Sequence, residues 1–240
     1  MSRIDKSSIF AVAALLMIFS AMNSYAVVAS AEGACDVGAD IALEVGDYAT
    51  AIELHQRLLR SERNNGIAHY HLGFAYGMAG LTAEEIGEYR TAIGLGFKKW
   101  DLFLNLGLAY ADHHEPERAI AALETAVSLG PDHAETHFNL AVVYERENRL
   151  DEALQEIITS LVLDPRNSDA LNTDAIICAR MGNVSFARAI WMQLLRQEPD
   201  YAPARTNLAL LNQSCGGACG SHTFYYPRRM SIQNRSGGEE

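Results

Sequence analysis

Two histidines and two cysteines are the residues whose spacing could support metal or redox chemistry. His133 and His137 stand four residues apart in the string HAETH, so they could share one face of a helix. The zinc-protease motif has this spacing, but it needs Glu directly after the first His, where the carboxylate can act on metal-bound water. Here Glu135 stands two residues after His133. We therefore predict that this segment binds no metal.

Cys215 and Cys219 enclose a short loop of Gly216, Gly217 and Ala218. This spacing differs from the CxxC of redox folds, and two thiols cannot by themselves supply the four ligands of a structural zinc site. In an oxidising compartment, a local disulfide between the two cysteines is the simplest interpretation. Since no constellation of nucleophile, base or ligand residues stands out, we predict no catalytic residue, no cofactor, no metal and no enzymatic activity.

The composition indicates an ordered, acidic protein. The chain has 240 residues, of which 49% are apolar, and this is ample material for a core. It carries 19 Lys and Arg residues against 30 Asp and Glu residues, a formal charge of -11. Affinity for nucleic acid rests largely on Lys and Arg displacing counterions from phosphates. The charge therefore argues against nucleic acid and anionic membrane surfaces as partners.

Residues 1–31 have the pattern of a secretory signal peptide. Arg3 and Lys6 precede the uncharged run from Ile9 to Met22, and small residues follow it. Cleavage is expected after Ala31, with Ala26 as the alternative. We therefore predict an exported protein, either periplasmic or secreted.

Two alternatives would attach the chain to a membrane. The apolar run is shorter than the roughly 20 residues that a spanning helix needs, but the residues after it could lengthen it into an uncleaved anchor. Cys35 could instead carry a lipid after cleavage. Lipoprotein signals place Leu or a similar residue three positions before the Cys, and Glu32 stands there. A membrane is thus expected as a partner only through one of these two features.

The body of the chain repeats with a constant period of about 34 residues. LGFAY at 72–76 returns as LGLAY at 106–110 and as LAVVY at 140–144. A second set of markers, out of phase with the first, has the same interval: Ala119, Ala153 and Ala187, and Pro131, Pro165 and Pro199. Two interleaved markers at one period define a structural unit.

Four complete units follow one another without insertion. A degenerate unit precedes them, and the last is followed by a capping helix and a tail that we expect to be disordered. The predicted domains are 32–65 for the degenerate unit, 66–99, 100–133, 134–167 and 168–201 for the complete units, 202–214 for the capping helix and 215–240 for the Cys/Gly loop and tail.

Each unit is predicted to be a pair of antiparallel helices. Phe103, Leu106 and Tyr110 fall on one face of a first helix, and Ala119 and Leu123 fall on one face of a second. Small residues stand where the two helices must approach closely, at Gly73, Gly107, Ala141 and Ala175 on the first helices. Asp132 followed by Glu135 has the pattern of a capping box for the next unit.

The Leu-Gly, Tyr, Ala and Pro markers resemble the tetratricopeptide repeat (TPR) family, in particular its exported members, over about 180 residues. The resemblance implies an all-α fold, a right-handed α-solenoid of antiparallel helix pairs whose first helices line a concave groove. The family pattern opens with an aromatic residue, and the match at this position is weak. The corresponding residues here are His69, Phe103, His137 and Leu171.

Two places depart from the family pattern. Glu85 stands where a small residue is expected, which predicts that its helix shifts or opens locally. Asp174 stands where Leu is expected, and a buried lone carboxylate would be costly. We therefore expect Asp174 either to pair with a cation, with Arg205 as one candidate, or to be exposed. Cys178, one turn after Asp174, should be a buried thiol.

The resemblance assigns the partner-binding groove to particular positions of the first helices. The floor is expected to be apolar, polar side chains run beside it, and Asp101, Glu135 and Asp169 form an acidic edge. The predicted groove residues are Tyr70, His71, Phe74, Leu104, Asn105, Leu108, Phe138, Asn139, Val142, Thr173, Ile176 and Asn207. Under the alternative interpretation, Asn is simply common at its position and the apolar residues pack between neighbouring first helices.

These features predict a non-enzymatic scaffold that binds a protein or peptide segment, in envelope assembly or secretion. The Lys and Asn clamp with which some family members grip a C-terminal carboxylate is missing, since Tyr70, Phe74 and Glu135 occupy its places. An apolar groove with an acidic edge suits a partner with hydrophobic anchors and basic flanks. The alternative is an accessory or regulatory subunit of an envelope enzyme complex. The tail, with Phe224, could itself visit the groove.

Overall fold

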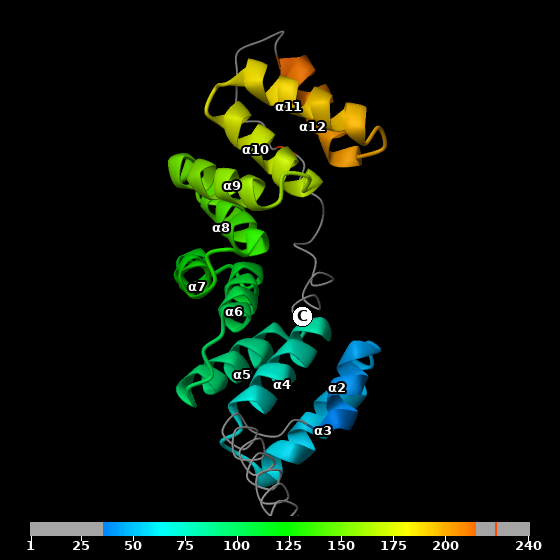
Figure 1. The fold of residues 1–240 in the computed structure, drawn as a ribbon, viewed down its shortest axis with the longest axis vertical. Helices are drawn as coiled ribbons and strands as arrows, with labels where there is room; N and C mark the ends of the chain where they lie inside the picture. Colours follow the sequence, from blue (N-terminus) through cyan, green and yellow to red (C-terminus); the bar gives the residue numbers. More distant parts are fainter. Residues whose placement is uncertain (1–35, 215–223, 225–240) are drawn as a thin grey trace, which may run out of the picture. The chain divides into compact units, whose positions relative to one another are not determined.

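The computed structural model describes residues 36–214 and residue 224. Within these residues the chain forms eleven helices and no strand (Figure 1). The predicted signal peptide at 1–31, Cys35 and the predicted disulfide between Cys215 and Cys219 lie outside them. No helix in the described part is both long and apolar enough to span a membrane. The helices fall into two compact units, one ending at Phe97 and the other beginning at Lys98, and each is described by itself.

The first unit contains four helices that pack one on the next along the chain. Polar side chains begin three of them: the carboxylates of Asp36 and Asp47 and the amide oxygen of Asn65 each accept hydrogen bonds from backbone N–H groups of the first turn. Such caps satisfy donors that the helix itself leaves without partners. The four helices are α2 (Val37–Glu44), α3 (Tyr48–Ser61), α4 (Gly66–Met78) and α5 (Thr82–Gly94).

The second unit contains seven helices, again packed in chain order. The first helices of the pairs begin at Trp100, Ala134, Ser168 and Ala202, at the constant interval of the sequence repeat. The seven helices are α6 (Trp100–Asp112), α7 (Pro116–Leu129), α8 (Ala134–Arg146), α9 (Leu150–Leu163), α10 (Ser168–Arg180), α11 (Val184–Gln197) and α12 (Ala202–Ser214). Both units are thus built as an all-α solenoid is, from helix pairs that contact their neighbours.

Close contact within a helix pair explains the small residues of the repeat. A Cβ placed on Gly107 of α6 would lie 2.6 Å from Cγ of Leu123 on α7 and 3.2 Å from the backbone oxygen of Ala119. Real side-chain atoms do not approach so closely, so the two helices can reach this separation only with glycine at 107. Ala119 and Leu123 are both fully buried at this contact.

The predicted capping box at the start of α8 is wrong. The N-cap residue is His133 rather than Asp132, and no side chain makes the capping hydrogen bond there. The His133 ring instead stacks on the indole of Trp100, with the ring centroids 3.6 Å apart. Packing against Trp100 has thus taken the place of the local hydrogen bond.

The predicted opening of the helix at Glu85 is also wrong. α5 runs without a break from Thr82 to Gly94, and Glu85 is buried within it. Space for the carboxylate comes from α4, since a Cβ on Gly77 would lie 2.4 Å from Oε1 of Glu85. The large residue on one helix is therefore matched by the loss of a side chain on the other.

Asp174 is half-buried on α10 and does not pair with Arg205. The Arg205 guanidinium donates to the backbone oxygen of Pro199 and lies 3.3 Å from Oδ1 of Asp200. The Cys178 thiol is buried, as predicted, and donates to Oδ1 of Asp174 at 3.6 Å. Burial raises the pKa of the Asp174 carboxyl, which the hydrogen bond from Cys178 offsets in part. Burial, together with the nearby Asp174 carboxylate, raises the pKa of Cys178 to about 11.

We expect Asp174→Asn to raise the free energy of unfolding at neutral pH by up to about 1 kcal/mol, because an amide carries no charge to desolvate. A carboxyl with a raised pKa in the folded state binds protons more readily when folded, so the wild type gains stability as pH falls through that pKa. The advantage of the variant should therefore shrink toward about pH 4. Urea titrations at both pH values measure it.

The control for this prediction is Asp200→Asn, which changes a fully exposed carboxyl on the same unit. It should alter stability by less than about 0.5 kcal/mol at either pH. An Asp174→Asn protein that is less stable than the wild type at neutral pH would contradict the account of a desolvated carboxylate.

Candidate partner-binding site

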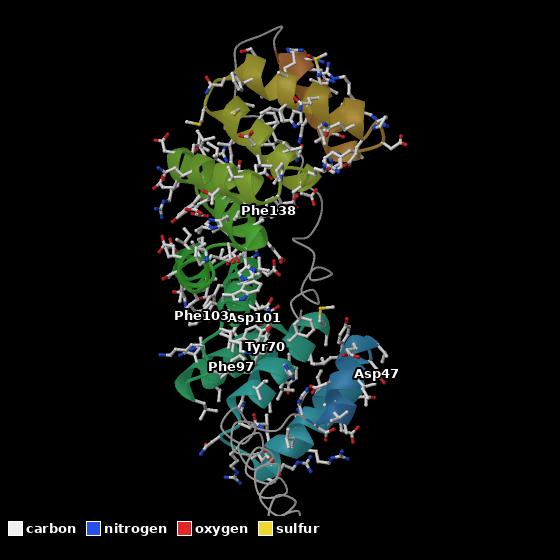
Figure 2. The ribbon with its side chains drawn as sticks, viewed as in Figure 1. Asp47, Tyr70, Phe97, Asp101, Phe103 and Phe138 are labelled. Carbon is white, nitrogen blue, oxygen red and sulfur yellow. The ribbon has the colours of Figure 1, made fainter. Side chains whose placement is uncertain are left out.

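In the first unit, the predicted groove residues Tyr70 and Phe74 lie one turn apart on α4, and both are half-buried. Figure 2 labels Tyr70 and Phe97, whose rings stack with their centroids 5.2 Å apart. The Tyr70 ring also packs against the ring of Tyr89 on α5, with the centroids 5.9 Å apart. Tyr70 thus packs against aromatic neighbours while part of its surface stays accessible.

In the second unit, the predicted apolar floor divides into two classes. Phe138 of α8 is half-buried and keeps exposed ring surface. Leu108 and Val142, in contrast, are 3% and 2% exposed, and Leu104 and Ile176 are equally buried. The four buried side chains belong to the core of the second unit. Only Phe138 among these five offers accessible apolar surface.

The predicted polar residues of the second unit are buried as well, at Asn105, Asn139, Thr173 and Asn207. Asn139 Nδ2 donates to the backbone oxygen of Glu135 at 2.9 Å, within α8. Asn207 Nδ2 donates to Oδ1 of Asn172 at 3.1 Å and so joins α12 to α10. These two amides therefore make hydrogen bonds inside the repeat array.

Asn172 is a residue that the sequence pattern did not single out. It is fully buried on α10, and its Oδ1 accepts from Nε1 of Trp191 on α11 at 3.0 Å as well as from Asn207. A buried Trp needs an acceptor for its N–H. That need was the signal that the sequence offered, because Trp191 stands on the helix that follows Asn172.

Two histidines contact glutamates on the following helix. Each His–Glu pair has the same separation in sequence as Asn172 and Trp191. His69 Nδ1 lies 2.5 Å from Oε2 of Glu88, and His137 Nδ1 lies 2.6 Å from Oε2 of Glu156. The other nitrogen of His137 faces a backbone oxygen at 3.0 Å. The ring of His137 thus replaces the family aromatic as a packing residue between helices, and His133 does not share its contacts.

Two residues of the predicted acidic edge already have partners within the second unit. Oδ1 of Asp169 accepts a hydrogen bond from the hydroxyl of Tyr201. Burial, with Asp169 nearby, raises the pKa of Tyr201. Oδ1 of Asp101 accepts from the backbone N–H of Leu102 at 2.8 Å.

The first helices of the second unit are also joined by an ion pair. Nη1 of Arg180 on α10 bonds to both the carboxylate and the backbone oxygen of Glu145 on α8, and Glu145 is almost fully buried. Arg180 Nη2 further donates to Oδ1 of Asn148 at 2.8 Å. The pair fixes α10 against α8, the helix that carries Phe138.

Comparison with known proteins identifies the repeat. The family model for the tetratricopeptide repeat matches residues 38–96 and 104–170. Among solved structures, YrrB, described as a TPR protein with an unusual peptide-binding site, is 23% identical with a TM-score of 0.65, over 79% of this chain and 96% of its own.

Two structures of MamA are similar as well. One is 24% identical with a TM-score of 0.64, over 71% of this chain and 99% of its own. The other, from Desulfovibrio magneticus RS-1, is 16% identical with a TM-score of 0.64, over 68% and 92%. A comparison with curated proteins finds no sequence match. The chain belongs to the tetratricopeptide repeat family, whose stacked helix pairs serve as scaffolds for protein interaction.

Proposed function

We propose that this protein is an exported, non-enzymatic scaffold that binds an extended segment of a partner protein through the first helices of its repeats. The observation that carries the proposal is that each unit has half-buried aromatic side chains on its first helices, Tyr70 and Phe74 on α4 and, separately, Phe138 on α8. Large aromatic rings that are held by packing and remain partly accessible lose little side-chain entropy on binding. The peptide-binding site described for YrrB supports a peptide as the type of ligand.

The charge favours a partner with basic residues beside its apolar anchors. The chain has a formal charge of -11, and Asp101, Glu135 and Asp169 stand in the first turns of α6, α8 and α10, with Glu135 on the same helix as Phe138. Opposite charge on a partner raises the association rate and helps to fix its register. Binding should therefore weaken as ionic strength rises, because salt screens exposed charges.

Export to the periplasm or the medium is the second part of the proposal. It rests on the signal-peptide pattern of residues 1–31, in which Arg3 and Lys6 precede an uncharged apolar run. A scaffold in that compartment would serve envelope assembly or secretion. Fractionation of cells followed by N-terminal sequencing tests this part: a new N-terminus near Ala31 supports it, and full-length protein in the cytoplasm would reject it.

Site-specific crosslinking tests the binding surface. A photoreactive phenylalanine analogue at Phe138 or Phe74 should capture a partner protein in living cells, because the analogue preserves the size of the ring it replaces. Leu108 and Val142 are unsuitable positions, since a larger side chain in the buried core would overpack it. Mass spectrometry then identifies the captured segment.

Val162 of α9 is the matched control position, since it is apolar, 73% exposed and carried by a second helix. Phe138→Ala should weaken binding of the captured segment by about tenfold or more, whereas Val162→Ala should leave it unchanged. Capture from Val162 but not from Phe138 or Phe74 would move the interface to the second helices and reject the proposed surface. An enzyme as the stoichiometric partner would make the protein an accessory subunit.

A further inference from the structure

Three side chains from three helices converge in the first unit. They are Asp40 of α2, His55 of α3 and His71 of α4, and each offers one ligand atom within 4.8 Å of the others. Oδ1 of Asp40 lies 2.9 Å from Nδ1 of His71 and 4.0 Å from Nε2 of His55. The two imidazole rings meet edge to face, with their centroids 5.5 Å apart.

His55 shows that this convergence is more than a surface ion pair. Its side chain is 0% exposed, and neither ring nitrogen has a hydrogen-bond partner among the described residues. A buried polar group without a partner is costly, and native proteins leave very few of them. Burial above all, and then the neighbouring His71, lowers the pKa of His55 to about 4. The ring is therefore neutral at physiological pH, with a lone pair on one nitrogen.

We propose that Asp40, His55 and His71 bind a divalent transition metal ion of the zinc type. Two neutral imidazoles and one carboxylate are a ligand set that suits Zn²⁺, Co²⁺ or Ni²⁺, whereas Mg²⁺ and Ca²⁺ prefer oxygen ligands throughout. The ligand atoms of a tetrahedral zinc site are about 3.3 Å apart. Shifts of about 1 Å in side chains at the ends of rotatable bonds would bring the three atoms to that spacing. Three protein ligands leave the fourth position to water.

The metal would connect the degenerate first repeat to the first complete one. Its ligands come from α2, α3 and α4, which are otherwise joined in this region by small apolar contacts around Ala42, Ala51 and Ala75. Because a metal that binds only the folded state stabilises it, the ion would hold the N-terminal end of the array together. His71 would then be a ligand rather than a contact for the partner segment.

The test uses the full chain with Cys215 and Cys219 both changed to Ser, so that the loop thiols cannot bind the probe. After removal of metal with a chelator, Co²⁺ should bind in a 1:1 ratio and give the intense visible absorption of tetrahedral coordination, which Zn²⁺ should abolish by displacement. Saturating Zn²⁺ should raise the thermal midpoint by about 5 °C or more. Failure to bind either ion would overturn the proposal.

Substitutions locate the bound metal. Asp40→Asn and His71→Gln change half-buried side chains and should each weaken Zn²⁺ binding at least tenfold. His55→Gln should also weaken binding at least tenfold. Because the His55 ring is fully buried, this variant could fail to fold, and the Asp40 and His71 variants then decide the test. His69→Gln is the control, since His69 lies on the same helix as His71 and pairs with Glu88 instead. Equal affinity in the Asp40, His71 and His69 variants would overturn the site.

Discussion

Replacing Trp191 by Ala should lower the free energy of unfolding of the second unit by about 3–5 kcal/mol. The indole is 0% exposed and lies at the centre of a core built from α10, α11 and α12. Its ring also contacts Phe224, with the centroids 5.8 Å apart. Removal creates a large cavity and takes the N–H donor from the buried Asn172. Because both contributions fall on one residue, we expect the largest effect here.

Urea titration followed by circular dichroism measures this effect, since Trp191 is itself one of the two fluorescent tryptophans. The matched control is Phe186→Ala on the same helix, where the ring is 69% exposed and the change should be below about 0.5 kcal/mol. Trp191→Phe should fall between the two, because it keeps most of the apolar contact but loses the hydrogen bond to Asn172. Equal loss in Phe186→Ala and Trp191→Ala would contradict the packing described for α11.

Replacing Gly73 by Ala should destabilise the first unit by about 1–3 kcal/mol, although alanine favours helix. A Cβ at this position of α4 would lie 2.7 Å from two ring atoms of Tyr89 and 3.3 Å from the backbone oxygen of Glu85. Tyr89 is fully buried and its ring is rigid, so it cannot turn aside. The helices must therefore separate, and buried apolar contact is lost along the pair.

Gly87 gives the matched control, because it stands in the interior of α5 with nothing within 4 Å of an added Cβ. Gly87→Ala should stabilise the same unit by up to about 1 kcal/mol, through helix propensity alone. The same chemical change is thus expected to have opposite signs on two adjacent helices. Chemical denaturation of both variants measures the difference, and stabilisation by Gly73→Ala would mean that α4 and α5 are further apart than described.

Helix positions were accessible from the sequence because they depend on local pattern. The helical spacing of apolar residues, the small residues and the prolines all recur at one constant period, and their repeated recurrence makes the assignment secure. Trp100, Ala134 and Ser168, the predicted first residues of three units, are the residues at which α6, α8 and α10 begin. Details at the helix ends were less accessible, as the N-cap at His133 illustrates, because a stacked ring outweighed the local capping pattern.

The candidate site was only partly accessible. The repeat register identified which residues stand on the first helices, but it could not separate the half-buried Phe138 from the buried Leu108 and Val142, since all three fit the same apolar pattern. Exposure depends on the rotation and spacing of neighbouring helices. A difference of a fraction of a turn decides whether a side chain enters the core or stays at its edge.

What the sequence determined by itself is the repeat unit, the all-α class and the family, because each follows from residues whose spacing is fixed within one helix pair. Only the tertiary structure decided which polar residues meet. Asn172 joins Trp191 and Asn207, and Asp40, His55 and His71 converge, in each case from three consecutive helices. The physical reason is that such contacts depend on side-chain direction and inter-helix distance to within about 1 Å, and a residue pattern along one chain carries neither quantity.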